Sequence, residues 1–336
     1  MALLEVNNLN VRFPTEDGVV HAVRDVSFSV DRGEVLGIVG ESGSGKSVTN
    51  MAIMSLLPRS TRIDGSIRYN DNEIVGLPRK RQTMFRGSEI GMIFQDPMTS
   101  LNPVYTVGWQ LAEAVRAHSK VTRARARERA VELLDLVGIP NPKERVDSYP
   151  HEFSGGMRQR VIIAMSMANN PQLLIADEPT TALDVTVQAQ ILETLMEIKE
   201  RTNIAIILIT HDLGVVAGMA DRVMVMYAGA AVEIGTVDDI YYRPKMPYTI
   251  GLLGAIPSEA SDGKKLRQIK GATPSLINMK PGCPFCTRCP IVVQQCLSET
   301  PTLETLEYGG HMAACHRRNE LDVNEVRSLF APEVTA

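Results

Sequence analysis

A glycine-rich segment of eight residues, placed directly after a short apolar stretch, constrains the fold of this chain more than any other feature. It runs Gly40-Glu41-Ser42-Gly43-Ser44-Gly45-Lys46-Ser47, and residues 35–39 before it are Val-Leu-Gly-Ile-Val. Glycines allow the backbone to wrap closely around phosphate groups, and the N-terminus of a following helix presents N–H groups to them. The pattern therefore predicts a strand, a phosphate-binding loop and a helix that reaches Leu57.

Two side chains at the end of this loop have the chemistry that a bound nucleotide requires. Lys46 is expected to supply a positive charge to the β- and γ-phosphates, and the Ser47 hydroxyl is expected to bind Mg²⁺. The other loop residues expected to contact the phosphates are Gly40, Ser42, Gly43, Ser44 and Gly45. A glycine-rich turn without chemistry does not require the lysine, the hydroxyl and the strand in register, which favours the nucleotide site.

Two carboxylates end a second apolar stretch, in which Leu173 to Ala176 precede Asp177 and Glu178. Open α/β sheets bind ligands at the carboxyl ends of their strands. We expect Asp177 to hold the Mg²⁺ shell and Glu178 to polarise the attacking water as a general base. A solvated strand end is the alternative interpretation, but two carboxylates after a buried strand carry a desolvation cost that a cation offsets.

Short β-branched and apolar runs alternate with helical patterns through the first three quarters of the chain. Such runs occupy residues 35–39, 90–94, 173–176 and 223–226. This alternation predicts an α/β fold with a mainly parallel sheet covered by helices. A crossover helix between two strands is predicted from apolar residues on one helical face, namely Ile191, Leu192, Leu195 and Ile198.

The pattern changes twice along the chain of 336 residues. Helical and polar sequence begins near Asp96, and we expect a helical subdomain over about residues 96–165. After about residue 240 the sequence becomes rich in proline and is interrupted by glycine. We therefore predict a main domain over residues 1–240 and a C-terminal extension over residues 241–336.

Charge and hydropathy exclude several classes of partner. The formal net charge of −4 gives no general attraction to nucleic acid or to an anionic lipid surface. Four arginines between positions 123 and 129 alternate with other residues, including Glu128, which indicates a solvated helix face more than a nucleic-acid surface. The N-terminus lacks the pattern of a secretory signal, and the apolar runs are far shorter than the roughly 20 residues that span a bilayer. We expect a cytoplasmic chain without a nucleic-acid partner.

A segment just upstream of the acidic strand identifies a family. Ser154-Gly155-Gly156-Met157-Arg158-Gln159 resembles the signature sequence of ATP-binding cassette (ABC) proteins. Further elements appear in the order of that family: Gln95, then Ala182-Leu183-Asp184, then His211. Phe13 resembles the aromatic residue on which the adenine stacks, although an aromatic there can also pack the first sheet. The resemblance covers residues from about 3 to 240.

This resemblance implies a P-loop NTPase of the ABC cassette type that binds ATP and Mg²⁺. Ser154, Gly155 and Gly156 would start a helix whose exposed N–H groups bind phosphate. In the family's head-to-tail dimer, the signature of one subunit closes over the γ-phosphate held by the other. The resemblance also implies that Asp184 lies at the nucleotide and that His211 contacts the γ-phosphate. Gln95 would sense Mg²⁺ and link the site to the helical subdomain that touches the membrane subunits.

The C-terminal extension resembles that of peptide-importer ATPases, the group that handles oligopeptides, dipeptides and nickel. The resemblance begins at residues 242–257, from Tyr-Arg-Pro to Ile-Pro. It continues with Gly282-Cys283-Pro284-Phe285-Cys286-Thr287-Arg288-Cys289, which matches the group's Gly-Cys-x-Phe-x-x-Arg-Cys pattern. Cys296 and Cys315 complete the usual four thiols.

Four thiolates can hold either a [4Fe–4S] cluster or a tetrahedral Zn²⁺ ion. The resemblance favours the iron–sulfur cluster, with Cys283, Cys289, Cys296 and Cys315 as its ligands. The chain departs from the pattern by its additional Cys286, which is an alternative ligand. His311 and His316 lie nearby and could substitute in a zinc site, and free structural thiols are the remaining alternative.

Together these features imply the ATP-hydrolysing subunit of an importer for peptides, bound peripherally at the cytoplasmic face of the inner membrane. The implied partners are a second ABC ATPase subunit, two integral-membrane permease subunits and an extracytoplasmic solute-binding protein. One alternative is the ATPase of a related importer for nickel or another small solute. Another is a soluble ABC ATPase of translation or DNA repair, which the single phosphate loop and the lack of a long coiled-coil or zinc insertion disfavour.

Overall fold

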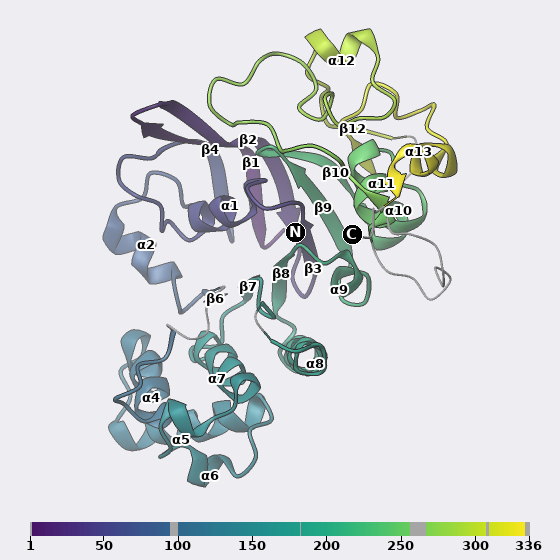
Figure 1. Ribbon diagram of the computed structural model, residues 1–336. Helices are drawn as coiled ribbons and strands as arrows, with labels where there is room; N and C mark the ends of the chain where they lie inside the picture. The colour runs from purple at the N-terminus through teal and green to yellow at the C-terminus, as the bar shows by residue number, and fades with distance from the viewer. Residues whose placement is uncertain (1, 95–99, 182, 256–266, 307–308, 333–336) are drawn as a thin grey trace. The chain divides into compact units, whose positions relative to one another are not determined.

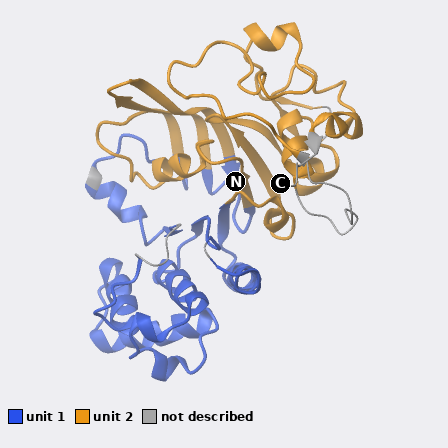
Figure 2. Ribbon diagram, viewed as in Figure 1, with its two compact units in different colours: residues 1–4, 29–35, 68–209 blue, residues 5–28, 36–67, 210–336 orange. Residues whose placement is uncertain are grey.

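The computed structural model describes residues 2–94, 100–181, 183–255, 267–306 and 309–332 (Figure 1). The chain forms two compact units, each assembled from separate segments (Figure 2). Unit 1 comprises Met1–Leu4, Ser29–Val35 and Arg68–Ile209, and unit 2 comprises Glu5–Phe28, Leu36–Ile67 and Thr210–Ala336. The domain division near residue 240 that the sequence suggests stays a prediction.

Unit 1 combines a parallel sheet with a group of helices. Its elements are β5 (Asn72–Glu73), α2 (Arg79–Phe85), β6 (Ile90–Ile93), α4 (Val107–His118), α5 (Arg123–Leu136), α6 (Pro142–Arg145), the 3₁₀ helix η1 (Pro150–Glu152), α7 (Gly155–Ser166), β7 (Leu173–Asp177), α8 (Val185–Thr202) and β8 (Ala205–Thr210).

The strands β8, β7 and β6 lie in this order and run parallel, with Ile175 of β7 opposite Ile207 on one side and Met92 on the other. Every residue of β7 and β8 is buried. Strands of a parallel sheet are covered on both faces, which explains why their sequences are continuous apolar runs. Helix α8 buries Ile191 and Leu195, so the predicted crossover helix is confirmed.

Helices α4 and α5 of unit 1 begin at threonine caps. The hydroxyl of Thr106 accepts a hydrogen bond from the N–H of Trp109 at the start of α4, and Thr122 caps α5 in the same way. Such caps satisfy N–H groups that have no partner within the helix. On α5, Arg125 pairs with Glu128, and both side chains are exposed. The interpretation of the basic run as a solvated helix face is therefore confirmed.

Unit 2 contains the phosphate loop and the C-terminal extension. Its elements are β1 (Leu4–Thr15), β2 (Gly18–Val30), β3 (Val35–Val39), α1 (Lys46–Ile53), β4 (Arg62–Tyr69), α9 (Leu213–Ala217), β9 (Arg222–Tyr227), β10 (Ala230–Thr236), α10 (Val237–Tyr242), α11 (Pro247–Gly254), β11 (Arg267–Gln268), α12 (Gln294–Ser298), β12 (Glu304–Thr305), β13 (Met312–Ala313), α13 (Val323–Leu329) and β14 (Ala331–Pro332).

The C-terminal extension packs into the same sheet as the strand that precedes the phosphate loop. Strand β9 pairs in parallel with β3 and antiparallel with β10. The extension adds β13 beside β10, with Ala313 opposite Glu233, and β12 follows at the edge. One hydrophobic core contains Tyr227 of β9 together with Tyr248 and Phe285 of the extension. The extension therefore shares its core with the neighbouring part of unit 2.

A buried polar pair joins the extension to β10. Nε2 of His311 lies 2.8 Å from Oε1 of Glu233, whose side chain is fully buried. Burial raises the pKa of Glu233, and the hydrogen bond from His311 opposes that rise. His311 therefore serves as the partner of a buried carboxylate, and Nε2 of His316 lies 3.0 Å from the carbonyl oxygen of Glu299. The contact of His311 with Glu233 does not support the zinc role considered for His311, whereas the zinc role of His316 stays a prediction.

Three element ends differ from the sequence expectation. Helix α1 ends at Ile53 and does not reach Leu57. Strand β6 ends at Ile93, and Phe94, predicted as its last residue, is 47% exposed. Strand β7 extends to Asp177. Among the described residues, no helix combines the length and the apolar character needed to cross a membrane.

Candidate active site

The phosphate loop, residues 40–47, starts where the buried strand β3 ends and leads into α1. Its first and sixth positions require glycine. A Cβ atom at Gly40 would lie 2.2 Å from the carbonyl oxygen of Met226, and one at Gly45 would lie 2.6 Å from that of Ala22. Both glycines also have a positive φ, 154° and 101°. The close wrapping of the backbone expected from the sequence is therefore present.

Lys46, the first residue of α1, directs its ammonium group into the loop. Nζ donates hydrogen bonds to the carbonyl oxygens of Gly40 at 2.6 Å and Glu41 at 3.0 Å, and the residue is only 6% exposed. This geometry puts a positive charge at the centre of the loop. Phosphate oxygens can replace the two carbonyl oxygens there as acceptors of the hydrogen bonds from Nζ. Ser47 follows on the first turn of α1 and is half-buried.

The two carboxylates expected at the end of β7 lie in unit 1. Asp177 is the last residue of the strand and is 4% exposed. Glu178 has a φ of 49°, a left-handed conformation that residues other than glycine seldom adopt. Its N–H donates to the carbonyl oxygen of Ile209 at 2.9 Å, and Oε2 accepts a hydrogen bond from Thr181 at 2.9 Å. Such held backbone strain is concentrated at functional sites, and here it orients the carboxylate proposed as the base.

The signature segment forms the N-terminus of α7. The Ser154 hydroxyl accepts a hydrogen bond from the N–H of Met157 at 3.3 Å, and Ser154 and Gly155 are exposed. Gly156 is required for packing, because a Cβ there would lie 2.6 Å from Cγ1 of Val187 on α8. The structure thus presents the start of a twelve-residue helix with its first residues open to solvent. The N–H groups at an exposed helix N-terminus of this kind can bind an anion.

Gln159, the last residue of the signature segment, makes a buried contact that the sequence did not predict. It is 1% exposed, and its Nε2 donates to the carbonyl oxygen of Pro179 at 2.7 Å. Pro179 directly follows Glu178, so this bond ties the signature helix to the residues that carry the candidate base. The available signal was its place at the end of the signature segment, two residues before the apolar run Val161 to Ala164.

The remaining predicted site residues have varied surroundings. Phe13 is half-buried on β1, and His211 is exposed directly after β8. Asp184 caps α8, because its carboxylate accepts a hydrogen bond from the N–H of Val187 at 2.9 Å. Gln95 lies outside the described residues, as does Ala182. The structure therefore places Asp184 in a helix cap, and its role at a nucleotide remains a prediction.

The predicted residues group within their units. The phosphate loop, Phe13 and His211 belong to unit 2. Asp177, Glu178, Asp184 and the signature belong to unit 1. Within unit 1 the structure brings the signature helix and the end of β7 together through Gln159.

The five cysteines of the extension converge on one small cavity of about 20 Å³. The cavity is lined by Cys283, Cys286, Cys289, Cys296 and Cys315 together with apolar residues such as Phe285. All five are free thiols. Burial raises the pKa of Cys283 to about 12 and that of Cys289 to about 11. The donor set suits a thiolate-bound metal, but among the described residues no group of three or more His, Cys, Asp or Glu side chains has a metal-binding arrangement.

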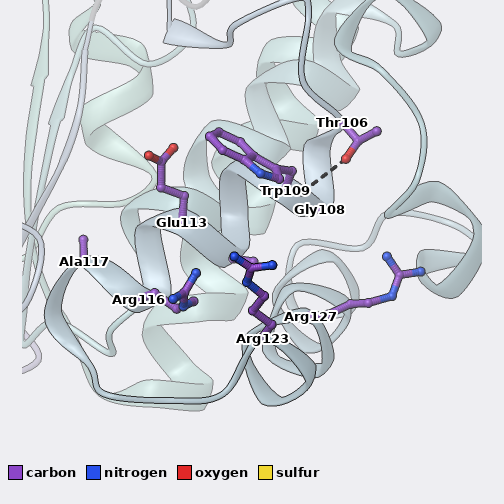
Figure 3. A pocket seen from close by; sticks show the side chains of 9 residues that line it. Thr106, Gly108, Trp109, Glu113, Arg116, Ala117, Arg123 and Arg127 are labelled. Carbon is purple, nitrogen blue, oxygen red and sulfur yellow. Dashed lines mark hydrogen bonds between the residues drawn. The ribbon is translucent and has the colours of Figure 1, made fainter.

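A groove of about 740 Å³ lies on the helices α4 and α5 of unit 1 (Figure 3). Trp109, half-exposed, lies on α4 and stacks on Tyr105 with ring centroids 4.0 Å apart. Arg116 of α4 and Arg123 of α5 line the same groove. Neither arginine forms an ion pair with a residue in the part of the chain that the structure describes. The groove thus combines an aromatic surface with the guanidinium groups of Arg116, Arg123 and Arg127, and of these Arg127 pairs with Asp147.

Two known protein families match separate parts of the chain. The family described as ABC transporter matches residues 23–181, which include the phosphate loop, the signature and the two carboxylates. The family described as oligopeptide/dipeptide transporter, C-terminal region, matches residues 232–296, which include four of the five cysteines.

Curated relatives cover almost the whole chain. The oligopeptide transport ATP-binding protein OppD of Salmonella typhimurium is 53% identical over 94% of this chain and 93% of its own length. The dipeptide transport ATP-binding protein DppD of Bacillus subtilis is 52% identical over 93% of this chain and 94% of its own length. OppD of Mycobacterium tuberculosis is 51% identical over 98% of this chain, and the chain spans about half of that protein, 55% of its length.

Solved structures of ABC cassettes share the fold. A dimeric, post-hydrolysis state of the cassette MJ0796 bound to ADP and Pi has a TM-score of 0.62 and 25% identity, over 70% of this chain and 98% of that one. CbiO1 of Clostridium perfringens, part of the ABC transporter complex cbiONQ, has a TM-score of 0.63 and 30% identity, over 75% of this chain and 95% of that one. By its motifs, its fold and these relatives, the chain belongs to the family of ATP-binding proteins of oligopeptide and dipeptide ABC transporters.

Proposed function

We propose that this chain hydrolyses ATP to power the uptake of dipeptides or oligopeptides through permease subunits at the cytoplasmic face of the cell membrane. One observation carries the hydrolase part: Glu178 is held in a left-handed conformation at the carboxyl end of the buried strand β7. The proposal that the cargo is a peptide rests on the relatives, because those that match nearly the whole chain are named for oligopeptide and dipeptide transport.

Each predicted site residue has a separate role in ATP hydrolysis. The loop amides and Lys46 bind the phosphates of ATP, while Phe13 stacks on the adenine. The Ser47 hydroxyl and the Asp177 carboxylate would supply the hard oxygen ligands that Mg²⁺ prefers, and Gln95 would join them. Mg²⁺, when bound, neutralises charge on the phosphates. Glu178 takes the proton from the attacking water, and His211 holds the water and the γ-phosphate in line.

A second ATPase subunit completes the site. The N-terminus of α7 is exposed, so its N–H groups are available to bind the phosphate of a nucleotide held by another subunit. The similar cassette MJ0796 is dimeric in its ADP-bound structure. In the proposed dimer, Ser154, Gly155 and Gly156 of one subunit cover the γ-phosphate of the ATP bound by the other, and Asp184 lies at the junction. Hydrolysis therefore requires association with a copy or a paralogue.

Coupling can be tested by the rate of ATP hydrolysis. The ATPase is assembled with its permease subunits in lipid nanodiscs, and the solute-binding protein is added with and without a peptide. We expect hydrolysis to rise when the peptide-loaded binding protein is present. A hydrolysis rate that does not change when the permease and the binding protein are added would oppose a transport function. A rise in the rate only with nickel would assign the chain to a metal importer.

The permease contacts the groove on α4 and α5. Its occupant is proposed to be a cytoplasmic permease segment that places an apolar side chain against Trp109 and an acidic side chain against Arg116 and Arg123. Neither arginine has an ion-pair partner among the described residues, which supports an acidic residue on the permease. Trp109 is the only tryptophan of the chain, so it reports directly on docking.

Replacing Trp109 by alanine is expected to weaken permease binding about thirtyfold, because buried tryptophans at interface centres contribute about 2 kcal/mol or more. Binding is measured by interferometry with the permease in detergent. In the parent protein, docking should shift the tryptophan fluorescence. Tyr242→Ala, which removes an aromatic side chain that is 77% exposed outside this groove, is the matched control. Equal affinity of the Trp109→Ala variant and the parent would remove the groove from the interface.

The cysteine module is proposed to hold a [4Fe–4S] cluster through Cys283, Cys289, Cys296 and Cys315. Its support is the convergence of these thiols on one cavity of the C-terminal extension. The cluster would staple the extension, and no electron transfer is assigned to it.

Metal content tests this assignment. Protein purified without oxygen should show broad absorbance near ~400 nm and about four irons per chain. Cys286→Ser should keep the iron, whereas Cys315→Ser should lose it. One zinc per chain in colourless protein would replace the cluster by a zinc site, and metal-free folded protein would leave the five cysteines as structural thiols.

A further inference from the structure

A buried arginine of the C-terminal extension holds the second residue of the phosphate loop. Nη1 of Arg288 donates to Oε2 of Glu41 at 2.7 Å, and Nη2 donates to Oε1 at 2.9 Å. This is the parallel, bidentate geometry in which a guanidinium binds a carboxylate most strongly. The Arg288 side chain is 4% exposed and that of Glu41 27%, so solvent screens the pair only partly.

The other donors of Arg288 fix it firmly within unit 2. Nε donates to the carbonyl oxygen of Lys270 at 3.1 Å, and Nη2 to that of Ile269 at 3.2 Å. Nη1 also reaches the Tyr227 hydroxyl at 3.3 Å, and the guanidinium lies 5.8 Å from the centre of that ring. The hydrogen bonds that Arg288 donates to the Glu41 carboxylate hold the pKa of Arg288 above its ordinary value. Arg288 is therefore a fixed, permanently charged group.

The main chain of the loop is held at the same residue. The N–H of Glu41 donates to the Tyr248 hydroxyl at 2.8 Å, and Tyr248 is fully buried against Tyr227 and Phe285. The carbonyl oxygen of Glu41 accepts one of the hydrogen bonds from Lys46. Glu41 thus connects two residues of the extension with the lysine that faces the phosphates.

The negative charge of Glu41 affects nucleotide binding. The Glu41 carboxylate belongs to the loop that must accept the negative phosphates of ATP, and an uncompensated carboxylate there would repel them. Arg288 supplies the compensating charge. It directly precedes Cys289, so the compensating group is anchored in the cysteine-rich segment itself.

We propose that Arg288 is a positioning residue for nucleotide binding, which orients the phosphate loop through Glu41 and neutralises that carboxylate. The C-terminal extension thereby sets the affinity of the cassette for ATP. This inference rests on the proposed ATP site, but it concerns a residue outside the cassette motifs.

The test compares the affinity of four full-length proteins for a fluorescent ATP analogue with Mg²⁺: the parent, Arg288→Gln, Glu41→Gln and the double variant. Arg288→Gln should bind about tenfold more weakly, because it leaves a partly buried carboxylate beside the phosphates. Glu41→Gln removes that carboxylate and should stay within about threefold of the parent. The double variant should recover most of the loss, since neither charge remains.

Two further measurements separate positioning from general damage. A positioning role raises the KM for ATP in Arg288→Gln and changes kcat little. Arg288→Lys keeps the charge but loses the bidentate fork, so its affinity should fall between those of the parent and Arg288→Gln. Arg318→Gln is the matched control, because Arg318 pairs with Glu304 inside the extension. It should bind the analogue like the parent.

Several results would overturn the proposal. Parent-like affinity of Arg288→Gln is one, and a weakened Arg288→Gln without recovery in the double variant is another. If Arg288→Gln does not fold, the double variant decides, because a tenfold loss there would show that neutralisation is not the effect. Failure of the parent itself to bind the analogue would instead contradict the proposed ATP site.

Discussion

Glu178→Gln is expected to lower the rate of ATP hydrolysis about a thousandfold while ATP still binds. Glutamine has nearly the same shape, so it can keep the left-handed backbone at this position and an oxygen acceptor for Thr181. It cannot take a proton from water. With hydrolysis blocked, ATP should trap the closed dimer.

Phosphate release gives the rate, and size-exclusion chromatography with and without ATP gives the dimer. Glu197→Gln, which alters an exposed glutamate of α8, is the control and should hydrolyse ATP like the parent. Normal turnover in Glu178→Gln would show that Glu178 is not the general base and that another group takes the proton from water.

Lys46→Ala is expected to weaken ATP binding about a hundredfold, the effect of losing charge-assisted hydrogen bonds to the phosphates. The ammonium already lies inside the loop on the carbonyl oxygens of Gly40 and Glu41. Alanine leaves the glycine geometry of the loop intact, so the loss reports on the charge itself. Titration with a fluorescent ATP analogue measures it.

Lys143→Ala controls for the change in net charge, because Lys143 is an exposed residue on α6 of unit 1. It should bind ATP as the parent does. Undiminished affinity in Lys46→Ala would show that the loop is not the phosphate site, whatever its sequence pattern.

The phosphate loop could be predicted because its determinants are local. Gly40 and Gly45 have no room for a Cβ and have a positive φ, and both requirements follow from the conformation of a short segment. The buried strand β7 could be predicted equally well, because a strand covered on both faces must be a continuous apolar run.

Long-range polar pairs could not be predicted in the same way. Gln159 and Pro179 are 20 residues apart, and Arg288 and Glu41 are 247 residues apart. No local pattern encodes such pairing, since it depends on how distant segments meet. His311 shows the same limit: its place among the cysteines suggested a metal role, but its partner is the buried Glu233.

The arrangement of the five cysteines could be predicted only in part. The convergence of five thiols on one cavity agrees with their crowding in the sequence. Their distances to a common metal do not follow from spacing, and no ligand set is formed among the described residues. Thiol ligands move and lose protons when a metal binds, so the arrangement without metal cannot be read from the motif alone.

The most direct test of the central claim is peptide transport itself. The chain is reconstituted with its partner ATPase and permease subunits in proteoliposomes, oriented so that ATP is supplied on the ATPase side and the peptide-loaded binding protein on the other. We predict that labelled peptide moves to the ATPase side only with hydrolysable ATP, and that Glu178→Gln abolishes this movement. Peptide movement that is unaffected by Glu178→Gln, or ATP hydrolysis without any peptide movement, would contradict it.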